Sequence, residues 1–179
     1  MKTIWKAFLA TAALASVSLN SQAAVATVGS PRYYNGHNYY LIGQGSWSAS
    51  EAFAQSMNGH LVTINDAAEN AWLTTNFLLP NPTMNPWMGL NDADNNGSWL
   101  WSSGESVSYL NWAPGEPNFS WELHGNIYEN TAGPSLVGKW NNAPGDTTLY
   151  GIVEVPEPAT MSIVLLAALG CAAQKLNRK

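Results

Sequence analysis

The sequence has 179 residues, 46% of them hydrophobic and 11% charged, which is enough for one domain that buries its own core. Five of the seven lysines and arginines lie in the first six and the last five residues, so residues 24–158 hold two basic residues against twelve acidic ones, a net charge of −10. This balance argues against a nucleic-acid partner, which needs a basic patch. It is compatible with binding of a hard divalent cation and equally with an acidic, solvated surface.

The first predicted element is a secretory signal peptide over residues 1–24. Lys2 and Lys6 precede an apolar run, and small-residue cleavage sites follow it. The alternative interpretation of the run is a buried helix. A signal peptide is removed on export, so we expect the folded domain in the rest of the chain.

Two helices are predicted in the first half of the domain, after a hairpin. The hairpin spans residues 33–42 around the turn pair Asn35-Gly36. Capping boxes at 48–51 and 66–69 mark the starts of the helices. The side chains expected to face the core are Ala52, Phe53 and Met57 in the first helix, which ends at Asn58-Gly59, and Trp72, Leu73 and Phe77 in the second.

The second half is predicted to consist of short strands joined by long loops. A Gly/Pro-rich stretch over residues 102–118 is the longest of these loops, and long loops in a compact domain usually carry function. Helices early and antiparallel strands late indicate an α+β fold. The tryptophans expected in the core are Trp72, Trp87, Trp99 and Trp101. Strands are predicted at 60–64, 87–90, 99–101, 126–128, 139–140 and 149–155.

Five segments resemble those of C-type lectin-like domains, and they occur in the order typical of that family. They read GHLVTINDAAENAWL, WMGLNDADNNGSWLW, NWAPGEPN, KWNN and YGIVEV, and the resemblance covers about Tyr33 to Val155. The resemblance implies one domain over residues 30–155. Its fold would be α+β, with two helices flanking small antiparallel sheets, chain ends that pair, and a long structured loop.

The resemblance also implies a joint calcium and carbohydrate site. The residues matching the family's ligands are Glu116, Asn118, Glu122, Asn141 and Asn142, with the Glu116–Pro117 bond expected to be cis. In the family, Glu-Pro-Asn accompanies equatorial hydroxyl pairs of the mannose, glucose or fucose type. The sugar hydroxyls would complete the oxygen shell of the ion.

Asn142 departs from the family pattern, which has an aspartate there. An amide still offers an oxygen, but the anionic ligands fall to Glu116 and Glu122. Because ligand charge tunes calcium affinity, we expect weak binding, on the order of the millimolar range of extracellular modules. The alternative is a site that has lost metal binding while the fold is kept.

Several other residues admit a chemical role beside a structural one. The loop Asp92–Gly97 begins like a calcium loop but is also favourable turn sequence. Glu122 and His124 form a weak zinc pair without a third ligand. Trp121 is suited either to stacking on a sugar or to core and rim packing. Glu116 and Glu122 as the acid and base of a glycosidase is the least favoured alternative, so we expect no enzyme.

The last 25 residues resemble a PEP-CTERM sorting signal of Gram-negative bacteria. Val155–Pro158 supplies the recognition tetrapeptide, residues 159–173 an apolar stretch too short for a regular membrane span, and residues 175–179 a basic end. The resemblance implies transient inner-membrane association and cleavage by an exosortase. A permanent anchor is the alternative. The single cysteine, Cys171, lies in this tail, so the domain folds without disulfides.

The combined hypothesis is an exported, surface-sorted module that binds a polysaccharide or glycan through calcium. The alternative from another class is a structural or protein-interaction domain that uses the same fold without sugar. Glycan binding with and without a chelator separates the two.

Overall fold

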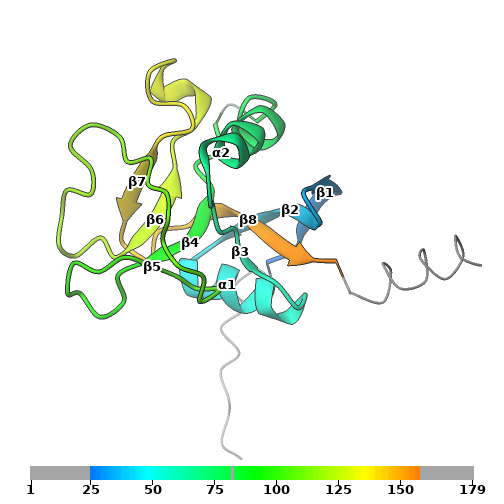
Figure 1. Cartoon of the computed structure of the whole chain (residues 1–179), viewed down its shortest axis with the longest axis horizontal. Helices are drawn as coiled ribbons and strands as arrows, with labels where there is room; N and C mark the ends of the chain where they lie inside the picture. The colour runs from blue at the N-terminus through cyan, green and yellow to red at the C-terminus, as the bar shows by residue number, and fades with distance from the viewer. Residues whose placement is uncertain (1–24, 82, 158–179) are drawn as a thin grey trace, which may run out of the picture.

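The computed structural model describes residues 25–81 and 83–157 (Figure 1). The predicted signal peptide and residues 158–179 of the predicted sorting tail lie outside these ranges. In the described part of the chain, no helix is both long enough and apolar enough to cross a membrane.

The fold is α+β, as predicted. Two helices lie among the strands of one mixed sheet, and two short helical turns, η1 (Thr74–Leu78) and η2 (Asn130–Ala132), follow α2 and β6. The elements are β1 (Thr27–Tyr34), β2 (His37–Gly45), α1 (Trp47–Ser56), β3 (His60–Leu61), α2 (Ala67–Leu73), β4 (Trp87–Asn91), β5 (Leu100–Trp101), β6 (His124–Ile127), β7 (Trp140–Ala143) and β8 (Leu149–Pro156).

The strands form one sheet in the order β1-β2-β8-β4-β6-β7, with β3 beside β8 and β5 beside β4. All pairs are antiparallel except β4 with β8, which meet in parallel at Trp87 and Gly151. This parallel contact joins the two antiparallel groups that the resemblance implied as small sheets, and Val62 bridges the same two strands by accepting from Gly89 N and donating to Ile152 O. The predicted pairing of the chain ends is present, because β2 pairs with both β1 and β8.

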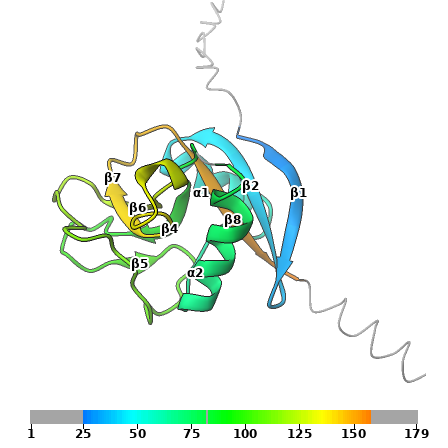
Figure 2. The same cartoon turned by 90° about the horizontal axis from the view of Figure 1, so that it is seen from above.

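The core lies on both faces of the central strands, and the helices cover it from opposite sides (Figures 1 and 2). Neighbouring residues on β8 point to opposite faces, as the pleat of a strand requires. Ile152 belongs to the larger cluster under α2, and Val153 to the smaller one under α1. Trp87, Trp101 and Trp140 are fully buried, while Trp72 and Trp99 are half-buried and pack against the core.

The first predicted capping box is wrong. The N-cap of α1 is Ser46, whose hydroxyl accepts from Ala49 N at 3.2 Å, and Glu51 points inward instead of back to the helix start. The Glu51 carboxylate accepts from Leu61 N at 2.9 Å and from Ser102 Oγ at 3.0 Å, so tertiary contacts outweigh the local cap. Ala52, expected to face the core, is exposed, and α1 buries Ser50, Glu51 and Ala54 instead.

The second predicted cap is confirmed. Asp66 is the N-cap of α2, and its Oδ1 accepts from Glu69 N at 2.8 Å. Glu69 in turn accepts from Asn65 N at 2.9 Å, one residue before the cap. The hairpin turn is also confirmed, because Asn35 and Gly36 both have positive φ, as a type I′ turn requires.

Candidate functional site

The long loop between β5 and β6 carries the first part of the predicted site. Its backbone turns at Glu116, whose N–H donates to Ala113 O at 3.0 Å, and the Glu116–Pro117 bond is cis, the conformation that the resemblance implied. Beyond the proline, Asn118 Nδ2 donates to Glu116 Oε1 at 3.1 Å. The carboxylate and the carboxamide therefore lie side by side on the same side of the turn.

Tyr128 connects this loop to β7, and sequence reasoning missed it. Its hydroxyl is 3.3 Å from Glu116 Oε1 and 3.0 Å from Asn141 Oδ1, so it can donate to either oxygen. Tyr128 directly follows β6, the strand that pairs with β7. The signal in the sequence that would have indicated Tyr128 is its hydroxyl, which comes directly after the strand that pairs with the strand of Asn141.

Negative charge gathers at this point of the surface. Burial, followed by the nearby charge of Glu116, raises the pKa of Glu122, and burial followed by Glu116 raises the pKa of the Tyr128 hydroxyl. Glu116 Oε2 is buried and has no hydrogen-bond partner among the residues that the structure describes. Two carboxylates that repel each other, one with an unpaired oxygen, favour a cation between them.

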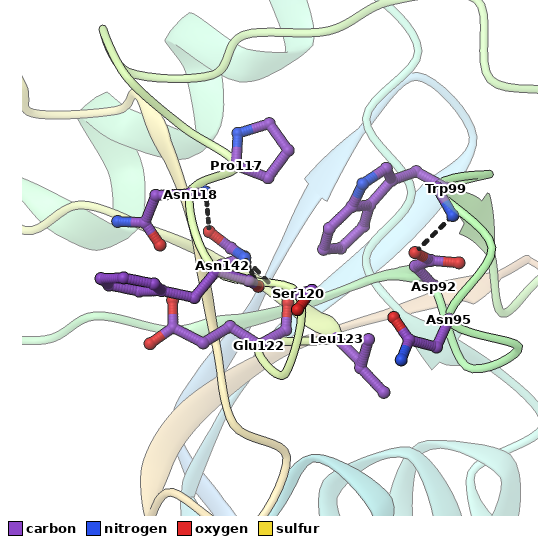
Figure 3. Close-up of a pocket in the computed structure, with 11 residues that line it drawn as sticks. Asp92, Asn95, Trp99, Pro117, Asn118, Ser120, Glu122, Leu123 and Asn142 are labelled. Carbon is purple, nitrogen blue, oxygen red and sulfur yellow. Dashed lines mark hydrogen bonds between the residues drawn. The ribbon is translucent and has the colours of Figure 1, made fainter.

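Asn142 lies beneath the loop rather than at its surface. The residue is 1% exposed, and all of its side-chain polar atoms are bonded to loop backbone. Oδ1 accepts from Asn118 N at 3.1 Å, while Nδ2 donates to Phe119 O at 3.2 Å and to Glu122 O at 2.8 Å. Figure 3 shows the Asn142 carboxamide between Asn118 and the chain around Ser120.

The structure thus divides the five predicted site residues into two groups. Glu116, Asn118 and Asn141 are linked through side-chain hydrogen bonds, and Glu122 is close enough for its pKa to respond to Glu116. Figure 3 shows the Glu122 carboxylate on the same side of Asn142 as the Asn118 side chain. Asn142 is the exception, since its carboxamide is occupied by the loop.

These side chains offer the kind of oxygen atoms that calcium takes as ligands. Calcium prefers several oxygen ligands from carboxylates and amides in a flexible shell, and the unpaired Glu116 oxygen is one such donor. Within the described residues, no three acidic, histidine or cysteine side chains converge as metal ligands. An ion held here would therefore depend on Asn118 and Asn141 as well as on the two carboxylates.

A cavity of about 370 Å³ borders the site, and Asn118, Glu122 and Asn142 are among the residues that line it (Figure 3). It separates residues 117–123 from the turn that follows β4, and Trp99 and Asp92 line its far wall. Asp92 is 6% exposed, and its two oxygens accept from Asn96 N at 3.1 Å and from Gly97 N at 2.9 Å. These bonds support the turn interpretation of Asp92–Gly97 over a calcium loop.

Two aromatic rings project from the same loop. Phe119 and Trp121 stack with their ring centroids 4.5 Å apart and their planes 17° from parallel. Trp121 is 63% exposed and Phe119 49%, so neither contributes to the core. This exposure removes core packing as an explanation of Trp121.

Packing, the interpretation favoured over zinc binding for Glu122 and His124, agrees with the structure. His124 lies against Trp47, with ring centroids 4.6 Å apart, and borders a separate pocket with Ser46 and Asp146. Burial lowers the pKa of His124. The histidine is therefore a packed aromatic ring on the side of the sheet where α1 begins.

Comparison with known sequences identifies a family. The model of the Lectin C-type domain family matches residues 43–150. Lithostathine of Rattus norvegicus is 37% identical over 94 residues, which is 51% of this chain and 57% of that protein. The human secretory phospholipase A2 receptor is 35% identical over 83 residues, which is 46% of this chain and 6% of the receptor. The chain thus spans only part of the length of these relatives.

Comparison with solved structures agrees with this match. The C-type lectin domain of murine dendritic cell inhibitory receptor 2, solved in complex with N-glycan, has a TM-score of 0.62 and 27% identity, covering 74% of this chain and 100% of that one. A herring type II antifreeze protein has the same TM-score at 18% identity, covering 72% of this chain and 97% of that one. The second likeness concerns the fold alone.

Proposed function

Because the chain belongs to the C-type lectin domain family, we propose that it binds carbohydrate at the surface formed by Glu116, Asn118, Glu122 and Asn141. The observation that carries the proposal is the convergence of loop and strand at Tyr128, whose hydroxyl lies within hydrogen-bond distance of both Glu116 and Asn141. The ligand class is a polysaccharide or glycan with vicinal hydroxyls. The murine receptor domain solved with an N-glycan supports this choice.

Binding depends on calcium in this proposal. Bound calcium would supply a Lewis-acidic centre to which sugar hydroxyls add as oxygen ligands. The protein's own residues do the rest: Glu116 accepts hydrogen bonds from the sugar, Asn118 and Asn141 offer amide donors and oxygens, and Tyr128 orients Glu116 and Asn141. The order of carboxylate and amide in Glu-Pro-Asn favours mannose- or glucose-type sugars.

A glycan array, read with calcium and again with a chelator, tests the proposal. We expect binding to mannose- or glucose-terminated glycans that disappears on chelation. Binding that survives chelation would support carbohydrate binding but overturn the calcium mechanism. Absence of binding to any glycan would overturn the lectin and favour the structural or protein-interaction domain.

We further propose that the protein is exported and sorted to the cell surface of a Gram-negative bacterium. The support is the sequence alone: the apolar start after Lys2 and Lys6, and the Val155–Pro158 motif followed by an apolar stretch and a basic end. Mass spectrometry of the protein recovered from the producing cell should find it without residues 1–24 and cut near Val155–Pro158. Retention of the tail would favour a permanent anchor over an exosortase product.

A further inference from the structure

Asn142 has a polar environment that only a carboxamide satisfies. One neighbour, Asn118 N–H, is a donor, and two others, Phe119 C=O and Glu122 C=O, are acceptors. A carboxamide has one oxygen and two N–H donors, which matches this set. The three partners also determine which end of the side chain is oxygen and which is nitrogen.

The strand beneath makes Asn142 a firm point of attachment. Asn142 pairs with Gly125 across β6 and β7, and Trp140, two residues before it on β7, is fully buried. The loop residues that it holds, 118 to 122, are mostly exposed, and Phe119 O also accepts from Glu122 N at 3.1 Å. A buried side chain on a paired strand thus holds an exposed turn at three backbone atoms.

We propose that Asn142 is a positioning residue that fastens the binding loop to β7 by hydrogen bonds, so that Glu116, Asn118 and Glu122 are held in their binding arrangement before a metal ion arrives. The inference concerns how the site is built. It rests on the proposed function only in treating the loop as a binding loop, and its test requires no sugar.

An aspartate at this position would behave differently. It could still accept from Asn118 N, but its second oxygen would face the carbonyl oxygens of Phe119 and Glu122, so Glu122 O would lose its donor and Phe119 O would keep only Glu122 N. A loop held by aspartate would therefore need a cation to neutralise the group. The asparagine replaces that requirement with two N–H donors, while it lowers the negative charge available to calcium.

The consequence is a separation of loop order from metal binding. A loop that is already ordered loses little conformational entropy when calcium binds, and ordering backbone is a major cost of binding to flexible segments. The weak calcium affinity expected from the lower charge then does not make the loop itself disordered at low calcium. Loop order in the presence of a chelator is the property that distinguishes this arrangement.

Backbone hydrogen exchange of the purified protein, followed at the Asn118 amide, tests the inference. In wild-type protein with chelator present, we expect the Asn118 amide to be protected, because it donates to Asn142 Oδ1. In Asn142→Asp with chelator, exchange should be faster by about tenfold or more, since the carbonyls of Phe119 and Glu122 lose the donor that Asn142 supplies and face a negative charge instead. Added calcium should restore protection in Asn142→Asp and change it little in the wild type.

Asn96→Asp is the matched control. It makes the same change of charge in an exposed turn, and an aspartate there can still accept from Ser98 N, the bond that Asn96 makes. It should leave the exchange of the Asn118 amide unchanged. The β8 amides, measured in the same samples, report global unfolding.

Two results would overturn the inference. One is a wild-type Asn118 amide that exchanges like an unprotected amide in chelator, which needs no variant to establish. The other is Asn118 exchange in Asn142→Asp that stays within twofold of the wild type. If Asn142→Asp lowers protection throughout β8, Asn142→Ala, which removes the bonds without burying a charge, should show the same tenfold effect. Failure of glycan binding would leave these outcomes unaffected.

Discussion

At the scale of single residues, the site depends on a few side chains whose roles differ although they lie close together. Glu116 has one oxygen paired with Asn118 and Tyr128 and another without a partner among the described residues. Asn141 faces the same hydroxyl, whereas its neighbour Asn142 points beneath the loop. Adjacent residues on a strand point to opposite faces, which explains how one pair of asparagines supplies both a binding group and a support.

The first prediction concerns the charge of Glu116. Glu116→Gln keeps an oxygen for Asn118 and Tyr128 and removes the negative charge, so calcium-dependent glycan binding should fall by about tenfold or more. Isothermal titration with calcium and with the glycan identified by the array measures the loss. Glu105→Gln, the same change at an exposed carboxylate on another part of the surface, should bind normally. Equal affinities of wild type and Glu116→Gln would contradict the assigned role.

The second prediction concerns the exposed aromatic pair. Trp121 presents a large ring on the loop that carries Asn118 and Glu122, and stacking on the apolar face of a sugar is worth about 1 kcal/mol. Trp121→Ala should therefore weaken glycan binding by about fivefold and leave calcium binding unchanged. Tyr33→Ala, which removes an equally exposed ring from β1, is the control. A glycan affinity unaltered by Trp121→Ala would place the pair outside the sugar site.

At the scale of elements, helix α2 shows a local signal that tertiary structure left intact. Asp66 caps it, and Leu73 and Phe77 are buried, as the helical spacing predicted. Helix α1 shows the opposite case. Glu51 does not make its predicted capping bond and instead accepts hydrogen bonds from Leu61 and Ser102 in a buried cluster. A carboxylate that can collect several buried donors gains more there than from one exposed cap.

The third prediction concerns the cap of α2. Asp66→Ala removes the acceptor of Glu69 N and should lower the free energy of unfolding by about 1 kcal/mol. Chemical denaturation should show a lower midpoint with an unchanged slope. Asp94→Ala, at an exposed turn position, should change stability by less than about 0.5 kcal/mol. A midpoint shift of the same size in both variants would rule out a specific capping effect.

At the scale of the whole molecule, a buried polar cluster connects β2 and β8, the strands by which the chain ends pair, to α2. The Tyr39 hydroxyl on β2 donates to Glu69 Oε1 at 2.7 Å and lies 3.2 Å from Glu154 Oε1 on β8. Thr63 N donates to Glu154 Oε2 at 3.1 Å, and His37 Nδ1 is 2.7 Å from Glu154 Oε1. Burial, opposed by the bond from Thr63 and reinforced by Glu69, raises the pKa of Glu154 to about 7.

The fourth prediction is a pH dependence of stability that originates at Glu154. The folded protein holds this proton up to about pH 7, whereas the unfolded chain releases it near pH 4.5. The contribution of Glu154 to stability should therefore be greatest below pH 4.5 and decline as the pH rises to about 7, by on the order of 3 kcal/mol. Glu154→Gln should lack this part of the decline, as denaturation at several pH values will show. Asp94→Asn, at an exposed position of the turn after β4, should retain it, and a Glu154→Gln profile parallel to the wild type would contradict the prediction.

Much of this architecture could be predicted from local sequence. The hairpin at Asn35-Gly36, the second helix and the strand around Trp87 follow from turn chemistry and from the spacing of apolar residues, which act over a few neighbours. The predicted strand over residues 60–64 is shorter than expected. Beyond Leu61, the chain passes between β8 and β4, with Val62 N donating to Ile152 O and Gly89 N donating to Val62 O.

The sequence by itself determined the family, the α+β order of elements and the five polar residues gathered in the loop and on β7, because these depend on residue type and spacing. Only the tertiary structure decided which of the five can meet. Tyr128 could be identified as a site residue only from the pairing of β6 with β7. Asn142 was predicted to be a weak ligand, and its three hydrogen-bond partners show a different role. The physical reason is that a carboxamide's role is set by the donors and acceptors around it, and the fold collects these from distant parts of the chain.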